Sequence, residues 1–174
     1  MDEMLDIYDI SGKYLGKKTR SFCHGENPGV YHKPVWIWII NSKGEVLVQK
    51  RALVKKKSPG KWDMPSAGHI DSGETSLQGC VRETREELGI NVKEEEFIFL
   101  KEFINQRGWE IVQVYLLKKD IKIKDVKLQK EEVECVSWLN YDEFVKLLYS
   151  EDFCNHAQEY KDWVAETLKS YIKE

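Results

Sequence analysis

The stretch GHIDSGETSLQGCVRETREELGI, residues 68–90, decides how this sequence is interpreted. Thr75 and Gln78 have the spacing of a capping box, and Gly89 suits the position just past the end of a helix. We therefore predict a helix over residues 75–88. Its second half is unusual in charge, because residues 81–89 (VRETREELG) hold five charged side chains in nine positions.

A helix of this sequence has two different faces. At about 100° per residue, the apolar stripe is roughly 60° wide and the glutamates occupy an arc of about 100° on the far side. The predicted buried stripe contains Leu77, Val81, Thr84 and Leu88, and the opposite arc contains Glu83, Glu86 and Glu87. Glu83 and Glu87 are four residues apart, so their like charges repel. The arc is therefore either an ordinary solvated face or a binding site for cations.

The spacing of the flanking residues favours a binding site. Gly68 is followed by Glu74, then by Arg82-Glu83, Glu86-Glu87 and Gly89-Ile90. This run resembles the signature of the Nudix hydrolases, G-x5-E-x7-R-E-U-x-E-E-x-G-U, in which U is apolar. Eight of the nine fixed positions match, and the exception is Thr84, where the family has an aliphatic residue. Thr84 lies on the buried stripe, so this departure concerns packing and not the carboxylates.

The resemblance implies an α/β protein with the Nudix fold, a mixed β-sheet sandwiched between helices. It also implies a hydrolase that cleaves a diphosphate linked to another group. Divalent metal ions screen the charge of such a substrate and lower the pKa of bound water, and Mg²⁺ or Mn²⁺ would bind through carboxylate oxygens. By the resemblance, the metal ligands are Glu83, Glu86 and Glu87, Arg82 orients these carboxylates, and Glu74 supports the junction of loop and helix. Gly68 suits a loop that turns tightly near the ligand, and the identity of the general base stays open among the glutamates.

The preceding stretch, VLVQKRALVKKKSPGKWDMPSAGHIDSGE (residues 46–74), resembles the isopentenyl-diphosphate isomerases that share the Nudix fold. The matching residues are Arg51, Ala52, Lys55, Pro59, Gly60, Trp62, Gly68 and His69. By this resemblance Arg51 and Lys55 contact the substrate diphosphate, which fits the basic run of residues 55–57. Trp62 is predicted to lie in a loop and to be core or to stack on a substrate base.

The isomerases also bind a metal ion through histidines. By resemblance, His69 and His32 are candidate metal ligands, and His24 lies near a third position with its spacing off by one. Glu110 falls at an acidic position of the isomerase site and is a candidate substrate-binding residue, whereas Gly108 occupies a second such position. An isolated histidine is more often structural than a ligand, so both interpretations stay open here.

Two departures separate this sequence from the isomerases. Ala67 stands where they have a catalytic cysteine, and a methyl group cannot transfer protons at carbon. The isomerases also lack the full glutamate set. We therefore expect a metal-dependent hydrolase of a nucleoside diphosphate linked to another moiety, or of a similar small diphosphate. The alternatives are an isomerase, disfavoured by Ala67, and a non-catalytic Nudix-fold binding module, disfavoured by the costly glutamate set.

Composition sets the remaining limits. The 174 residues fit a single domain over residues 1–174, with 41% hydrophobic and 33% charged residues. The net charge of −3 argues against nucleic acid as a partner, and RNA decapping is disfavoured for the same reason. No apolar run approaches the roughly 20 residues of a membrane span, and the four cysteines form no C-x-x-C pair. A cytoplasmic protein is expected, and the resemblance allows a homodimer.

The other expected elements follow from local patterns. Residues 35–40 and 46–51 read as a hairpin, and residues 96–105, 110–117 and 132–139 as strands. Residues 141–150 and 157–174 have helical spacing, although 150–174 suggest no function. This order does not alternate as in a doubly wound sheet. Cys80 and Cys135 are expected to be small core residues. Glu131, Glu132 and Glu134 are expected on a solvated edge, with one of them a possible late carboxylate of the site.

Overall fold

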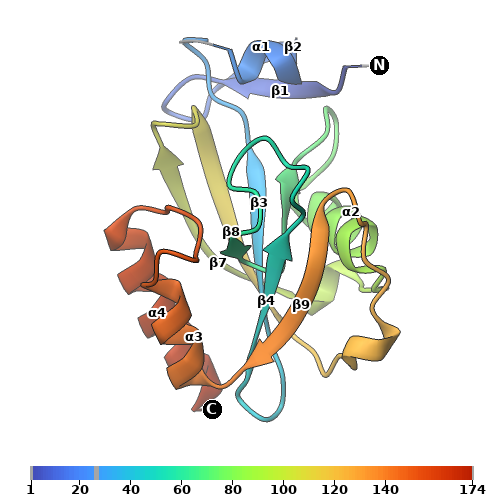
Figure 1. The fold of residues 1–174 in the computed structure, drawn as a ribbon. Coiled ribbons are helices and arrows are strands. Elements are labelled where there is room, and N and C mark those ends of the chain that lie inside the picture. The colour runs from blue at the N-terminus through green and yellow to red at the C-terminus, as the bar shows by residue number, and fades with distance from the viewer. Residues whose placement is uncertain (1, 26–27, 174) are drawn as a thin grey trace.

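A computed structural model describes residues 2–25 and 28–173, and it shows a mixed sheet between two layers of helices (Figure 1). Helix α2 covers one face, and helices α3 and α4 cover the other. The strands are β1 (Met4–Tyr8), β2 (Tyr14–Thr19), β3 (Pro34–Ile40), β4 (Val46–Arg51), β5 (Trp62–Asp63), β6 (Ser66–His69), β7 (Phe97–Asn105), β8 (Glu110–Lys118) and β9 (Val133–Leu139). The helices are α1 (Arg20–Cys23), α2 (Ser76–Leu88), α3 (Tyr141–Leu148) and α4 (Gln158–Ile172), with short 3-10 turns η1 (Glu94–Glu96) and η2 (Ile123–Asp125). The predicted fold class is confirmed.

Strand β3 is the centre of the sheet. It runs parallel to β8 from the pair Val35–Gln113 to the pair Ile40–Lys118, and antiparallel to β6. The predicted hairpin with β4 is present only at its turn, where Ile40 pairs with Val46. Beyond the turn the two strands diverge, because β6 pairs with β3 while β9 and β5 pair with β4.

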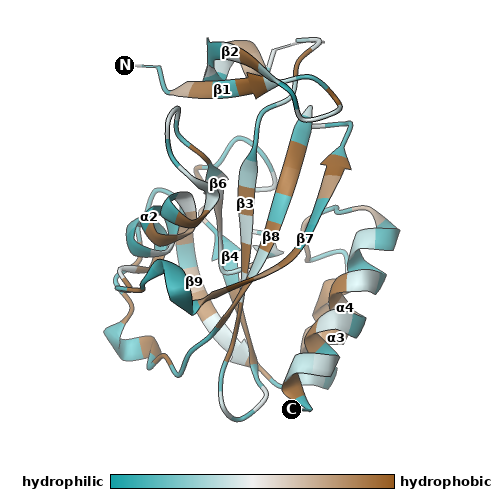
Figure 2. Ribbon diagram, turned by 180° about the vertical axis from the view of Figure 1, so that it is seen from behind, coloured by the Kyte–Doolittle hydropathy of each residue, from teal (hydrophilic) through white to brown (hydrophobic). Residues whose placement is uncertain are grey.

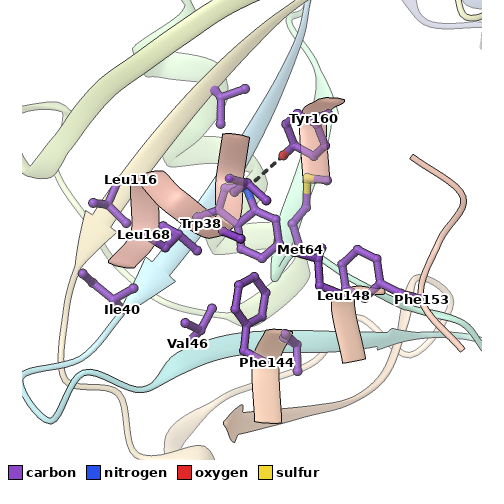
Figure 3. Packing of buried hydrophobic residues seen from close by; sticks show 14 of the residues in the cluster. Trp38, Ile40, Val46, Met64, Leu116, Phe144, Leu148, Phe153, Tyr160 and Leu168 are labelled. Atoms are coloured by element: carbon purple, nitrogen blue, oxygen red, sulfur yellow. Dashed lines mark hydrogen bonds between the residues drawn. The ribbon is translucent and has the colours of Figure 1, made fainter. Parts of the chain in front are cut away.

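Alternate residues of β3 feed two hydrophobic cores. Ile37 and Ile39 face the α2 side, where Cys80 and Leu88 of the helix are fully buried. Trp38 faces the α3 and α4 side, and its indole Nε1 donates to the Tyr160 hydroxyl at 2.9 Å (Figure 3). Figure 2 shows hydrophobic residues concentrated along β8, which lies between the two helical layers. Cys80 is a core residue as predicted, but Cys135 is only half-buried in β9.

The N-terminal residues form a separate layer, which the sequence patterns did not predict. Strands β1 and β2 make a two-stranded antiparallel sheet that lies beside one end of the main sheet (Figure 1). Backbone hydrogen bonds hold it there: Ser72 N donates to Met4 O at 2.9 Å, and Tyr8 and Tyr31 exchange two bonds. Leu5 and Ile7 of β1 form a small buried cluster with Cys23 of α1.

The C-terminal residues complete the second helical layer. Helix α4 confirms the helical spacing predicted for residues 157–174 over Gln158–Ile172, and Glu174 lies outside the described residues. Between α3 and α4 the chain runs along β5, where Trp62 N donates to Asp152 O and Cys154 N donates to Trp62 O, both at 2.8 Å. Within the described part of the chain, each helix is too short or too polar to span a bilayer.

Candidate functional site

An open cavity of about 1050 Å³ lies where β3 and β4 diverge. Helix α2 and strand β6 form one wall, the loop after β4 forms another, and the N-terminal layer forms a third. Its lining includes most of the residues predicted from the two motifs, namely Arg51, Lys55, Gly68, His69, Arg82, Glu83, Glu86, Glu87 and Glu110. The cavity therefore joins an acidic wall and a basic wall that lie far apart in the sequence.

The acidic wall depends on how α2 is fixed. Thr75 and Gln78 form the predicted capping box, and Gly89 ends the helix with a left-handed φ of 67°. The helical wheel placed Glu87 on the arc opposite the apolar stripe, yet this residue is only 6% exposed. Its Oε2 accepts a hydrogen bond from Ala67 N at 3.1 Å, so the glutamate face of the helix packs against β6. Glu86 lies at the exposed rim of the same face.

Gly68 makes this packing possible, for a reason different from the one predicted. It lies within strand β6, paired with Val35, and not in a tight turn. A Cβ atom at residue 68 would overlap the carboxylate of Glu83. Glycine is therefore required by the close approach of the helix carboxylate to the strand.

Arg82 lies at the centre of a hydrogen-bond network. Its Nε and Nη2 donate to the two carboxylate oxygens of Glu74 at 2.9 and 3.0 Å, and its Nη1 donates to Glu83 at 2.7 Å. Nη2 also donates to the His69 carbonyl at 2.7 Å, which ties the helix to the end of β6. Glu74 accepts a further bond from Asp71 N at 3.0 Å. This is the geometry expected if Arg82 orients the carboxylates and Glu74 supports the loop.

Burial raises the pKa values of two glutamates in the acidic wall. Desolvation raises the pKa of Glu87 to about 8, and the nearby charge of Glu83 adds to this effect. Desolvation also raises the pKa of Glu83 to about 7, although Arg82 opposes the shift. Crowded, desolvated carboxylates disfavour their own charge, and a bound cation would relieve that. The donor set therefore fits a hard divalent ion.

The three candidate histidines also come together. His24, His32 and His69 each place a ring nitrogen so that the three atoms lie within 4.8 Å of one another. His24 Nε2 and His69 Nε2 are 2.9 Å apart. His32 is fully buried, and its ring nitrogens have no hydrogen-bond partner among the described residues. Burial lowers the pKa of His32 to about 4 and that of His69 to about 2. Three imidazole rings gathered in this way, with the nitrogens of His32 left without a hydrogen-bond partner among the described residues, fit a metal ion.

Glu110 closes the histidine side of the cavity. Its Oε1 lies 3.8 Å from His32 Nε2, and its Oε2 accepts from Asn105 at 2.7 Å. Burial raises the pKa of Glu110. A Cβ atom at residue 108 would lie 2.6 Å from Glu110 Oε2, so Gly108 leaves room for this carboxylate.

The basic wall is the loop that follows β4. Lys55 forms an ion pair with Glu132, which also lines the cavity. Arg51 Nε and Nη2 donate to the Lys57 carbonyl at 3.3 and 3.2 Å, so the loop folds back over the guanidinium. Glu131 lines the cavity as well, whereas Glu134 lies in β9 and pairs with Lys50 at 3.8 Å. The solvated edge predicted for these glutamates is therefore only partly correct.

Trp62, predicted to bind the substrate, is not among the residues that line the cavity. It belongs to strand β5, not to a loop, and it packs against the core on the α3 and α4 side. Trp36, and not Trp62, is the tryptophan found among the described residues that line the cavity. Sequence reasoning also missed four N-terminal residues of the lining: Asp2, Glu3, Arg20 and Ser21. The acidic start of the chain was visible, but no motif connected it with the site.

Comparison with known proteins identifies the family. The family model described as NUDIX domain matches residues 30–163. The chain belongs to the Nudix family. An uncharacterized Nudix hydrolase of Clostridium acetobutylicum is 33% identical over 156 residues, which cover 84% of this chain and 74% of that protein. Nudix hydrolase 3 of Arabidopsis thaliana is 37% identical over 163 residues, 87% of this chain, but the match spans only 21% of that longer protein. The chain is accordingly an enzyme of the Nudix pyrophosphohydrolase type.

The isomerase resemblance and the fold are also found among known proteins. The isopentenyl-diphosphate Delta-isomerase of Corynebacterium diphtheriae is 28% identical over 178 aligned positions, covering 96% of this chain and 92% of that protein. The crystal structure of a Deinococcus radiodurans protein superposes with a TM-score of 0.73 at 20% identity, covering 97% of this chain and 98% of that one. This second likeness shows the fold alone.

Proposed function

We propose that the protein is a metal-dependent hydrolase that cleaves a diphosphate linkage in a small molecule, such as a nucleoside diphosphate linked to another moiety. One observation supports this most strongly. The three glutamates of the motif helix line the same cavity as Arg51 and the lysine loop of residues 55–57. An anionic diphosphate needs both walls, because cationic side chains bind its oxygens and carboxylates hold the cations that screen it.

Each group of residues has a distinct part in this proposal. Glu83, Glu86 and Glu87 would hold Mg²⁺ or Mn²⁺, with Arg82 and Glu74 keeping their carboxylates in place. The metal, when bound, supplies charge neutralisation and lowers the pKa of water. Arg51 and Lys55 would hold the phosphate oxygens, and Gly68 keeps the strand close to Glu83. The histidine cluster with Glu110 would be a second place for a metal in the same cavity.

An isomerase is the second candidate function, favoured by the histidine cluster and Glu110. Residue 67 argues against it, because Ala67 lines the cavity with a methyl group where proton transfer requires an acid or base. Cys80 cannot replace the missing thiol, since it is fully buried in the core beneath α2. Burial also raises the Cys80 pKa, which keeps this thiol protonated.

The test is hydrolysis of a panel of diphosphates in Mg²⁺ or Mn²⁺. The panel contains nucleotide sugars, nucleoside di- and triphosphates, dinucleotides, coenzyme A and isopentenyl diphosphate. We expect phosphate-containing products from at least one compound, and a loss of turnover on the order of 100-fold in Glu87→Gln, because a neutral amide is a poor ligand for a hard cation. Phosphate release is followed by a colorimetric assay and products by mass spectrometry.

Glu95→Gln is the matched control, since Glu95 is an exposed residue of η1 that does not line the cavity. It should leave turnover unchanged. Equal product release by the wild type and Glu87→Gln would contradict the role of the glutamates. Migration of the double bond in isopentenyl diphosphate, without hydrolysis, would favour the isomerase instead.

A further inference from the structure

The C-terminal segment, to which the sequence assigned no role, packs behind the cavity wall through His156. This residue lies in the connection between α3 and α4, which is hydrogen-bonded to β5. The His156 ring packs edge-on against Trp36, with ring centroids 5.0 Å apart, and in a tilted arrangement against Tyr160, with centroids 5.4 Å apart. Trp36 lines the cavity, so His156 lies directly behind one of its walls.

His156 is bonded to Asp63, the last residue of β5. Nε2 of the ring lies 2.9 Å from Asp63 Oδ1, which also accepts from Met64 N at 3.0 Å. Burial would raise the pKa of Asp63, but the neighbouring His156 and Arg51 outweigh it and lower that pKa. The carboxylate is therefore ionised, and because it can only accept hydrogen bonds, Nε2 of His156 carries the proton.

The other oxygen of Asp63 faces the basic wall. Asp63 Oδ2 lies 3.8 Å from Nη1 of Arg51, whose Nε and Nη2 are bonded to the Lys57 carbonyl. The guanidinium is thus held on two sides, by a carboxylate and by a backbone carbonyl. A planar guanidinium has five N–H donors in a fixed fork, so holding it on two sides aims the remaining donors. Arg51 lines the cavity, and these donors are available to an anion there.

We propose that Asp63 and His156 are positioning residues, which set the orientation of the Arg51 guanidinium toward the substrate diphosphate. The C-terminal segment acts through them: His156 fixes the Asp63 carboxylate, and Asp63 fixes Arg51. The inference rests on the proposed function, because it takes Arg51 as a ligand of the phosphate oxygens. It goes beyond that function by assigning the 150–157 segment to the site.

The test measures binding of methylenediphosphonate, a diphosphate analogue that cannot be hydrolysed, by titration calorimetry in Mn²⁺. We expect Asp63→Asn to weaken binding about tenfold, as removal of a residue behind a ligand-binding group typically does. Two variants of His156 separate its hydrogen bond from its ring. His156→Phe keeps an aromatic ring against Trp36 but removes the donor, and it should weaken binding as Asp63→Asn does. His156→Gln keeps a donor and should restore most of the affinity.

The decisive measurement is whether the effects of substituting Asp63 and Arg51 on binding are coupled. Arg51→Gln alone should weaken binding at least as much as Asp63→Asn, and the double variant should be no weaker than Arg51→Gln, because residues that act through one group are not additive. Asp152→Asn, an exposed residue of the same segment, is the matched control and should bind like the wild type. Melting temperatures identify any variant that fails to fold.

Three outcomes would overturn the inference: additive losses in the double variant, wild-type binding by both Asp63→Asn and His156→Phe, or binding that does not depend on Arg51. The proposed function fails separately. If the substrate panel shows no hydrolysis but methylenediphosphonate binding follows the expected coupling, the positioning pair stands without the hydrolase. If hydrolysis is found and the coupling is absent, the hydrolase stands without the positioning pair.

Discussion

Because Gly68 has no side chain, the carboxylate of Glu83 can lie directly against strand β6. Replacement by alanine would push this carboxylate away from β6 and out of its bond with Arg82. We expect Gly68→Ala to lower turnover on the order of 100-fold, since a displacement of about 1 Å at a reacting group has effects of this size. Its melting temperature should change little, because the end of a glutamate side chain can move.

Gly79→Ala is the matched control for this prediction. Gly79 lies in α2, and a Cβ atom there would meet Ile70 at 3.5 Å, an ordinary contact. Alanine also favours a helix over glycine by roughly 1 kcal/mol, so this variant should be active and slightly more stable. Activity assays and thermal melts check both variants. Full activity in Gly68→Ala would contradict the role given to the close approach.

The motif spacing predicted which residues of the site come together, but it did not predict how deeply each of them is buried. The spacing of Glu83 and Glu87 is a property of one helix, so it could be derived from the sequence alone. The burial of Glu87 involves its packing against β6, where Ala67 N donates to its carboxylate across 20 residues of sequence. No local pattern in β6 indicates that this strand lies against the glutamate face of α2.

Helix α2 carries a buried polar group on the face that packs against the sheet. Thr84 is fully buried, and its hydroxyl has no hydrogen-bond partner among the described residues. A buried hydroxyl without a partner is destabilising, so we expect Thr84→Val to raise the free energy of unfolding by about 1 kcal/mol. Thr84→Ser keeps the hydroxyl and loses a methyl group, so it should lower this free energy by about 1 kcal/mol. Denaturant unfolding of the three proteins checks both signs, and a less stable Thr84→Val would show that the hydroxyl is satisfied.

Among the elements, those with local signals were predicted well. The capping box and Gly89 fixed both ends of α2, and the strands β7, β8 and β9 lie close to their expected bounds. The pairing of β3 with β4 was wrong beyond the turn, because strands buried on both faces do not reveal their neighbours by alternation. The β1–β2 layer was missed because both strands are short and β2 lacks buried residues.

For the whole molecule, the buried ionisable groups predict a pH dependence of stability in the absence of metal. Glu83 and Glu87 have folded pKa values of about 7 and about 8, raised from 4.5. Above pH 4.5 the folded state holds protons that the unfolded chain releases, so their contribution to stability falls as pH rises. His32 and His69 act oppositely below pH 6.5, because their lowered pKa values make the unfolded chain bind more protons.

The two effects offset each other between about pH 5 and 6.5, and only the glutamates act above that range. We expect the melting temperature of the chelator-treated protein to be nearly level up to about pH 6.5 and to fall up to about pH 8. Glu87→Gln cannot ionise, so its decline over this range should be smaller. Calorimetric melts at a series of pH values check this, and a melting temperature that rises from pH 6.5 to 8 would contradict it.

The position of the N-terminal layer has a practical consequence for preparing shortened forms of the protein. The family match begins at residue 30, yet His24, Glu3 and Arg20 of the cavity wall precede it. A chain cut at that boundary would keep the whole Nudix motif and lose His24, whose ring packs against His32 in the histidine cluster. A shortened form for crystallisation or binding measurements should therefore keep the N-terminal residues that line the cavity, and not start where the family match starts.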